Sequence, residues 1–246
     1  MLYNRIKVNF FSYPTDIDAF NNKFVYNNRY QFYSALLNII RSQDSKLAED
    51  IHSNKIPRAF LFSNFIFSKL RKGNMNFHVY LSSRDGKVFN YLLKGLTKLN
   101  YFEINGIRAY KSNIQLEIYD VSNIDKFTFL SPFILRDKSG NTLETTDKFS
   151  KLIEGQIKRV ADKLYKNNIL KEKIEDFEVH LSSNNFKKKL FDIKGIKYRA
   201  WCANSSDDTI SFEGDSKDLA KMIAFYCGIG DKTNFGFGML GLPKGG

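Results

Sequence analysis

The spacing of apolar residues divides the chain into strands and helices whose order occurs twice. Strands are expected where apolar and polar residues alternate, as at Ile6, Val8 and Phe10, and helices where apolar residues recur at intervals of three and four. In the first half the predicted elements are a strand around 6–10, helices over 28–41 and 44–52, strands over 59–67 and 76–82, a helix over 88–99, and two strands within 101–120 that turn near Lys111-Ser112. Apart from the one extra strand, this is the element order of a ferredoxin-like fold.

The second half repeats this order. Its predicted elements are a strand over 127–135, a helix over 149–165, strands over 177–181 and 190–201 around a basic stretch, a strand over 209–212, and a helix that begins at Ser216. We therefore predict an α+β protein of two tandem ferredoxin-like domains, 1–122 and 123–246, with a glycine-rich loop near its end. A length of 246 residues suits two such domains.

Several protein classes are excluded by composition. Apolar runs stay well short of the roughly 18 residues that cross a bilayer, and the first residues lack the apolar region of a signal peptide. Two cysteines are too few for a disulfide scaffold. Two cysteines and three histidines also show no spacing typical of zinc ligands. We expect a cytoplasmic protein with reduced thiols, no metal and no membrane contact.

The charge balance gives the first positive signal. Lysine and arginine number 38 against 26 acidic residues, a formal net charge of +12, and aromatic residues make up 15% of the chain. An excess of cations favours a polyanionic partner, and aromatic rings between them suit single-stranded nucleic acid, whose bases stack on rings. The alternative is a core built from phenylalanine beneath a solvated lysine surface.

Five glycines lie within the last part of the chain, over 228–241. Neither common nucleotide motif fits, because Thr233 breaks G-x-G-x-x-G and Asp231 separates Gly230 from Lys232-Thr233. Glycines let backbone amides approach a phosphate or a neighbouring segment closely. The residues predicted to bind RNA here are Gly228, Gly230, Lys232, Asn234, Gly236 and Gly238. The alternative is an edge strand with bulges and a wide turn.

The pattern G-x-G-x5-G-F-G at the end of a doubled ferredoxin-like chain resembles the RAMP superfamily of CRISPR-associated proteins. More narrowly, the chain resembles the endoribonuclease that cuts precursor CRISPR RNA within its repeats. The likeness also includes the Tyr26-Asn27 pair, the LAEDIH segment that ends at His52, and the apolar FLFSNFIF strand.

This resemblance implies cleavage without a metal or cofactor. The ribose 2′-hydroxyl attacks the adjacent phosphorus and leaves a 2′,3′-cyclic phosphate and a 5′-hydroxyl. His52 stands where the family carries its catalytic histidine, and an imidazole with its usual pKa of about 6.5 can move either proton. Lys55 and Arg58 follow as electrostatic helpers.

The match departs from the family's pattern at two positions. Leu37 stands where some relatives carry a tyrosine, and Arg58 where some carry a lysine. Tyr33, or else Tyr30, is the candidate to replace the missing hydroxyl, and which group is acid and which is base stays open. The alternative for His52 is a helix-terminal histidine that interacts with the carbonyl end of its own helix. His78 and His180 lie within apolar alternation and are expected to be structural.

A second basic cluster lies on a predicted hairpin in the second half. Its members, interleaved with aromatic residues, are Lys187, Lys188, Lys189, Lys194, Lys197 and Arg199. Alternation along the strands places part of this set on one face, where it could read the backbone of a repeat stem. The alternative is a solvated, lysine-rich loop.

Three functions remain to be distinguished. The favoured one is a repeat-cleaving endoribonuclease that binds CRISPR repeat RNA and meets other CRISPR effector subunits. A RAMP subunit that holds guide RNA without cutting it is the main rival. A basic structural protein of ribosomes or chromatin is the third. A homodimer is left open.

Overall fold

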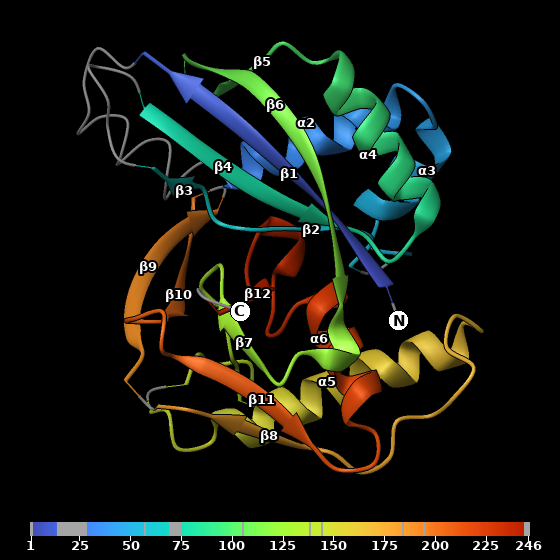
Figure 1. Ribbon diagram of the computed structural model, residues 1–246, viewed down its shortest axis with the longest axis vertical. Helices are drawn as coiled ribbons and strands as arrows, with labels where there is room; N and C mark the ends of the chain where they lie inside the picture. The colour runs from blue at the N-terminus through green and yellow to red at the C-terminus, as the bar shows by residue number, and fades with distance from the viewer. Residues whose placement is uncertain are drawn as a thin grey trace.

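The computed structural model describes residues 2–13, 29–56, 58–68, 75–104, 106–137, 139–143, 145–183, 185–193 and 195–243. It is a mixed α/β structure built on curled antiparallel sheets, one in the upper half of Figure 1 and one in the lower half. The chain completes the upper half before it enters the lower one.

The upper half consists of an antiparallel sheet with helices packed on one face. The strand order is β2-β4-β1-β6-β5, and β3 pairs with β4 beside β2. The strands are β1 (Leu2–Ser12), β2 (Leu61–Phe62), β3 (Ile66–Phe67), β4 (Met75–Ser82), β5 (Tyr101–Ile104) and β6 (Ile107–Asp120), and the helices are α2 (Arg29–Arg41), α3 (Ser45–His52) and α4 (Gly86–Lys98). Alternate residues of β1 and β4 point into one core with the apolar faces of the helices, because side chains alternate along a strand.

The lower half consists of a smaller sheet, two helices and a separate hairpin. Its strand order is β12-β7-β11-β8, also antiparallel. The strands are β7 (Lys126–Phe129), β8 (Glu178–Leu181), β11 (Thr209–Glu213) and β12 (Leu240–Gly241), the helices are α5 (Phe149–Lys166) and α6 (Lys217–Cys227), and the hairpin is β9 (Lys187–Ile193) with β10 (Ile196–Cys202). Short 3-10 turns lie at η2 (Val121–Asn123) and η3 (Thr233–Phe235).

The predicted helices are present, but three strand predictions are wrong. The single strand expected over 59–67 is two short strands, β2 and β3, which both pair with β4. The turn expected at Lys111-Ser112 is absent, since β6 runs unbroken through both residues and pairs with β1 across a bulge near Phe10. The chain turns instead before β6, where Gly106 has a φ of +77°. The strand expected over 127–135 ends at Phe129, and Pro132 lies in the loop that follows.

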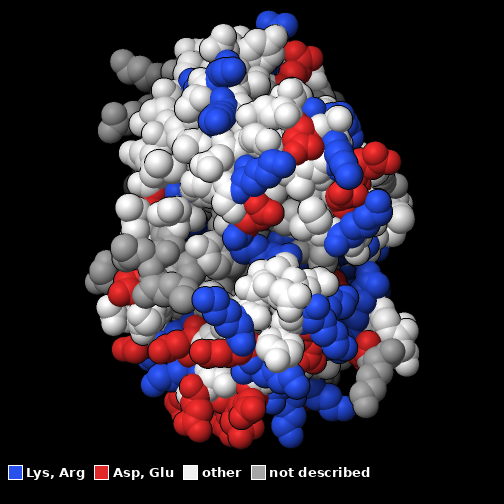
Figure 2. Space-filling view, turned by 90° about the vertical axis from the view of Figure 1, so that its right-hand side faces the viewer, with Lys and Arg blue, Asp and Glu red and all other residues white. Residues whose placement is uncertain are grey.

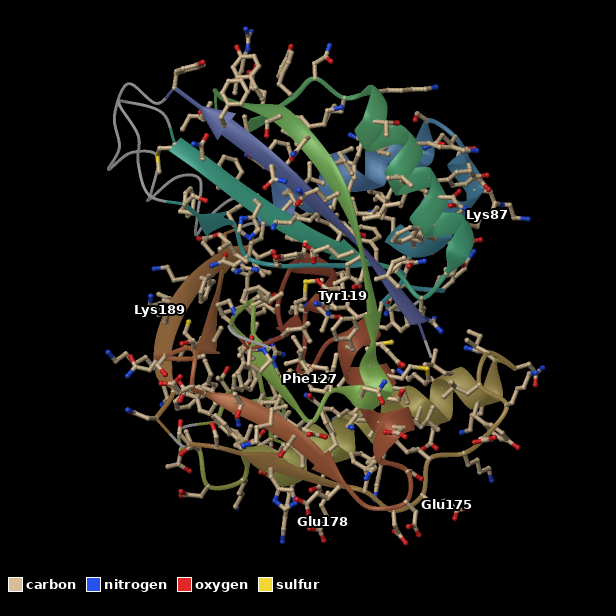
Figure 3. The ribbon with its side chains drawn as sticks, in the orientation of Figure 1. Lys87, Tyr119, Phe127, Glu175, Glu178 and Lys189 are labelled. Atoms are coloured by element: carbon tan, nitrogen blue, oxygen red, sulfur yellow. The ribbon has the colours of Figure 1, made fainter. Side chains whose placement is uncertain are left out.

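Two buried arginines of the upper half reach into the lower half. Arg5 donates to the carbonyl oxygen of Phe225 at 3.1 Å, and its guanidinium lies 3.4 Å from the centroid of the Phe225 ring. Burial lowers the pKa of Arg5 to about 9. Arg29 donates to the Gly236 carbonyl and lies 4.4 Å over the ring of Phe237. Tyr119, 5.8 Å from Arg5, marks this junction in Figure 3.

Candidate active site

A cleft of about 430 Å³ lies where the two halves meet. On the upper side it is lined by α2 and by the end of α3, and on the lower side by α5 and by the segment after α6. Residues far apart in the sequence, such as His52 and Lys163, therefore face one space.

His52 is the last residue of α3 and lines this cleft. The side chain of Asp44 accepts a hydrogen bond from the Leu47 amide at 2.9 Å and fixes the start of the helix. Asn54, with a φ of 62°, turns the chain immediately after the helix, as a residue in this conformation often does at a helix end. The imidazole is exposed and has no hydrogen bond to another described residue. It is thus available to a ligand in the cleft.

Three aromatic residues form the wall beside His52. The Phe235 ring lies 5.0 Å from that of Tyr33 and 6.0 Å from that of Tyr30. Tyr33 is only 4% exposed, and burial raises the pKa of its phenol, which makes it a weaker acid than a tyrosine in water. Leu37 is buried in the upper core and does not line the cleft.

Lys55 and Arg58 are not available in the way the sequence suggested. Lys55 does not line the cleft, and its ammonium forms an ion pair with Asp50 at 3.0 Å on the protein surface. Arg58 lines the cleft, but its guanidinium donates to the carbonyl oxygens of Gly228 at 2.9 Å and Gly230 at 2.7 Å, and to that of Cys227 at 3.2 Å. Burial lowers the pKa of Arg58. Its donors hold the glycine-rich loop in place.

The glycines of that loop lie inside the protein, contrary to the expectation that they face RNA. Gly228, Gly230, Gly236 and Gly238 are all buried and all have φ between 68° and 79°. A Cβ on Gly230 would lie 2.5 Å from the carbonyl oxygen of Ile134, and one on Gly238 would collide with that of Ile229. Glycine is required here because the loop packs closely against its own chain, not because a phosphate must approach it.

The accessible residues of the loop lie between the glycine pairs, although Thr233 in the same stretch is buried. Lys232 is exposed, with its ammonium 5.5 Å from the ring of Tyr198 on β10. Asn234 is half-buried, and its Oδ1 has no hydrogen-bond partner among the described residues. The carboxylate of Asp231 lies 3.6 Å from Arg136, which offsets its negative charge. Of the predicted loop residues, Lys232 and Asn234 are therefore the ones that a ligand can reach.

Lys163 is a cleft residue that sequence reasoning missed. It projects from α5, is exposed, and forms no ion pair within the described part of the chain. Arg159 lies one turn earlier on the same helix and lines an adjoining cavity. A basic pair at this spacing looks like any solvated helix face in the sequence, and only the position of Lys163 in the cleft opposite α2 and α3 distinguishes it.

Residues 114–242 match the family model described as CRISPR associated protein Cas6, C-terminal. The match covers more than half of the chain, from within β6 to beyond β12. The chain belongs to the Cas6 family. The resemblance to CRISPR-associated proteins is thereby confirmed, while the cleft residues from α2 and α3, His52 among them, precede the matched segment.

Relatives of the Cas6 family extend the likeness to nearly the whole chain. A Pyrococcus furiosus protein, described as a putative CRISPR-associated endoribonuclease-like protein Cas6, is 25% identical over 231 residues, which are 87% of this chain and 90% of the other. The solved structure of a Cas6-related protein from Pyrococcus furiosus has a TM-score of 0.71 at 18% identity, with coverage of 99% and 100%. A Cas6 product complex has a TM-score of 0.68 at 12% identity, with coverage of 97% and 99%. At these identities the two structures show a shared fold.

The basic cluster of this Cas6 family member lies on the hairpin β9–β10, along the left side of Figures 1 and 3, where Lys189 is labelled. Strand pairing places Lys188, Lys197 and Arg199 on one face, and Lys187 and Lys189 on the other. All five are exposed, whereas Lys194 lies outside the described residues. Through Lys232 and Tyr198 the hairpin adjoins the cleft.

The remaining histidines lie outside the cleft. His78 is half-buried on the outer face of the upper sheet, where burial lowers its pKa. His180 is exposed on β8, and its Nε2 lies 3.6 Å from the carboxylates of both Glu178 and Glu213. The Tyr26-Asn27 pair lies outside the described residues.

Within the described ranges, no three or more His, Cys, Asp or Glu side chains are grouped as metal ligands. Over the same ranges, no helix has the length and apolar character needed to cross a membrane.

Proposed function

We propose that this chain is an endoribonuclease that cuts precursor CRISPR RNA within its repeats. Cas6 family membership supports RNA processing, and the Pyrococcus furiosus relative carries the description endoribonuclease-like. The observation that carries the proposal is the position of His52, exposed at a cleft whose other side bears Lys163 and Lys232. Figure 2 views the molecule from the α3 and α4 side and shows Lys and Arg side chains above and below the junction of the two halves.

The reaction we propose is attack of the ribose 2′-hydroxyl on the adjacent phosphorus. The P–O5′ bond breaks, and the products carry a 2′,3′-cyclic phosphate and a 5′-hydroxyl. One proton must leave the 2′-oxygen and one must reach the 5′-oxygen. His52 moves one of them. The phenol of Tyr33, which lines the same cleft, is the second candidate group.

Cations must stabilise the extra negative charge of the pentacoordinate phosphorus. Lys163 and Lys232 line the cleft and take the role that the family resemblance implied for Lys55 and Arg58. Arg58 acts as a positioning residue, because its hydrogen bonds to Gly228 and Gly230 set the path of the segment that carries Lys232. Asn234, with an unpartnered Oδ1, is a further RNA contact.

The proposed chemistry needs only protons and cations that side chains supply, so we expect it to run without a metal ion. The test is to incubate labelled repeat RNA with purified protein in excess chelator and to analyse the RNA ends. We expect one discrete product with a cyclic-phosphate end. Binding without cleavage, or cleavage that returns only when a divalent cation is added, would contradict the proposal.

We also propose a finer description of the fold. Ordered by position in the sequence, the four principal strands of each half lie as 4-1-3-2, with β6-β1-β4-β2 above and β12-β7-β11-β8 below. This order, with helices between the first and second and between the third and fourth strands, supports two ferredoxin-like domains, 1–122 and 123–246. The turn η2 lies at that boundary. A cytoplasmic location stays a prediction.

A further inference from the structure

A second cavity, of about 170 Å³, adjoins the cleft and shares Arg58, Lys163 and Asp231 with it. Its other walls come from α5 and from the end of α6. Val160 and Leu164 make part of it apolar. The cavity is too small for a second substrate molecule and suits one planar group of a ligand that is already held in the cleft.

Gln156 of α5 lines this cavity and is 5% exposed. Its Oε1 is fully buried and has no hydrogen-bond partner among the described residues. A buried polar atom without a partner is unfavourable by about 1–3 kcal/mol, so a native protein seldom keeps one without a reason. A carbonyl-type oxygen in this position accepts hydrogen bonds only, and its natural partner is an N–H group of a ligand.

Two cations accompany Gln156 on the same helix. Arg159 and Lys163 follow it by three and seven residues, which places all three on one side of α5, and all three line the cavity. An apolar wall, an amide acceptor and flanking cations together match a nucleotide, with the base inside and its phosphates at the rim.

The proposed reaction explains why one base must leave the stack. The attacking 2′-oxygen, the phosphorus and the departing 5′-oxygen must lie roughly in line. Regular stacking along an A-form strand does not provide this alignment, so the nucleotides on the two sides of the scissile phosphate must be splayed apart. Enzymes that act on a displaced base hold it in a pocket and read its edge by hydrogen bonds.

We propose that this cavity receives a displaced RNA base next to the scissile phosphate, and that Gln156 selects a base with an exocyclic amino group. The amino N–H donates to Oε1 of Gln156, while Arg159 and Lys163 contact the neighbouring phosphates. This assignment rests on the proposed function and adds a specificity-determining residue to it.

The test is a double-mutant cycle between the protein and the RNA. Each amino-bearing base of the repeat is replaced in turn by an analogue that lacks only the amino group, and kcat/KM is measured for wild type and for Gln156→Leu. Leucine removes the acceptor and introduces no new polar group. Replacing an unsatisfied buried polar group by an apolar one of similar size changes the free energy of unfolding little. Gln156→Met serves if the leucine variant fails to fold. Gln115→Leu, on the outer face of the upper sheet, is the matched control.

We expect wild type and Gln115→Leu to lose about 5- to 10-fold at one position beside the cleavage site, the effect of one hydrogen bond to a buried partner. Gln156→Leu should cleave the natural RNA more slowly by a similar factor and show no further loss at that position. Equal losses in wild type and Gln156→Leu at every position would overturn the inference. The same cycle measured as Kd, on RNA with a 2′-deoxy nucleotide at each candidate site, tests the cavity even if wild type does not cleave.

Discussion

The side chains at the cleft show that residues close together in a sequence motif can have different roles in the structure. His52, Lys55 and Arg58 are close in the sequence, but only the imidazole of His52 is available in the cleft. The position of His52 could be predicted, because the helix that carries it ends just after it by local signals. The use of Arg58 could not, since its acceptor Gly228 lies 170 residues further along the chain.

At the level of single residues we predict that Lys163→Ala slows cleavage by about 10²-fold, because a cation that faces the reacting phosphate is removed. Lys55→Ala is the matched control: it also removes one ammonium, but one that pairs with Asp50 outside the cleft. Single-turnover rates at saturating protein give the comparison. Equal losses in both variants would mean that only overall charge matters.

The glycine-rich loop illustrates what is decided at the level of an element. Its glycine content correctly indicated that another group lies close to the loop backbone, but it did not indicate which group. The partner is the protein itself: Gly230 packs on Ile134, and Gly236 packs on Phe62 and Arg29. Contacts of this kind join segments that are distant in the sequence. The pairing of β6 with β1 is another example, because it keeps β6 extended at Lys111-Ser112, where a turn was expected. Local patterns cannot reveal them.

At this scale we predict opposite effects for two glycine-to-alanine changes. Gly238→Ala places a Cβ against the Ile229 carbonyl at a φ of +73°, and should lower the free energy of unfolding by about 2 kcal/mol or more. Gly155→Ala, within α5 and with nothing near its Cβ, should raise it by about 0.5–1 kcal/mol. Chemical denaturation measures both. A stable Gly238→Ala protein would show that the loop does not depend on close packing there.

For the molecule as a whole, the doubled order of strands and helices was readable from the sequence, and the joint between the halves was not. Arg5, Arg29 and Arg58 all extend from the upper half to carbonyl groups of the lower half. Each looks like a surface cation in the sequence, yet Arg5 and Arg29 are 1% exposed. The net charge of +12 therefore overstates the cationic surface that an RNA meets.

For the molecule as a whole, we predict that the hairpin β9–β10 contributes to RNA binding. Replacing Lys187, Lys188 and Lys189 by alanine should weaken RNA binding and reduce its salt dependence by roughly 0.7–0.9 log units per lost phosphate contact. Lys87→Ala, Lys94→Ala and Lys98→Ala, combined on α4, remove the same charge elsewhere and should leave the slope nearly unchanged. Titrations of Kd against salt compare the two. Identical slopes for wild type and the hairpin variant would remove the hairpin from the binding surface.

The central claim is that one imidazole at the junction of the two halves moves a proton during RNA cleavage. The most direct measurement is the single-turnover cleavage rate of repeat RNA by His52→Ala, with RNA affinity measured in parallel and His180→Ala, on the lower sheet, as the control histidine. We predict a loss of about 10²–10⁴-fold in rate with affinity retained for His52→Ala, and a normal rate for His180→Ala. An unchanged rate in His52→Ala would contradict the account.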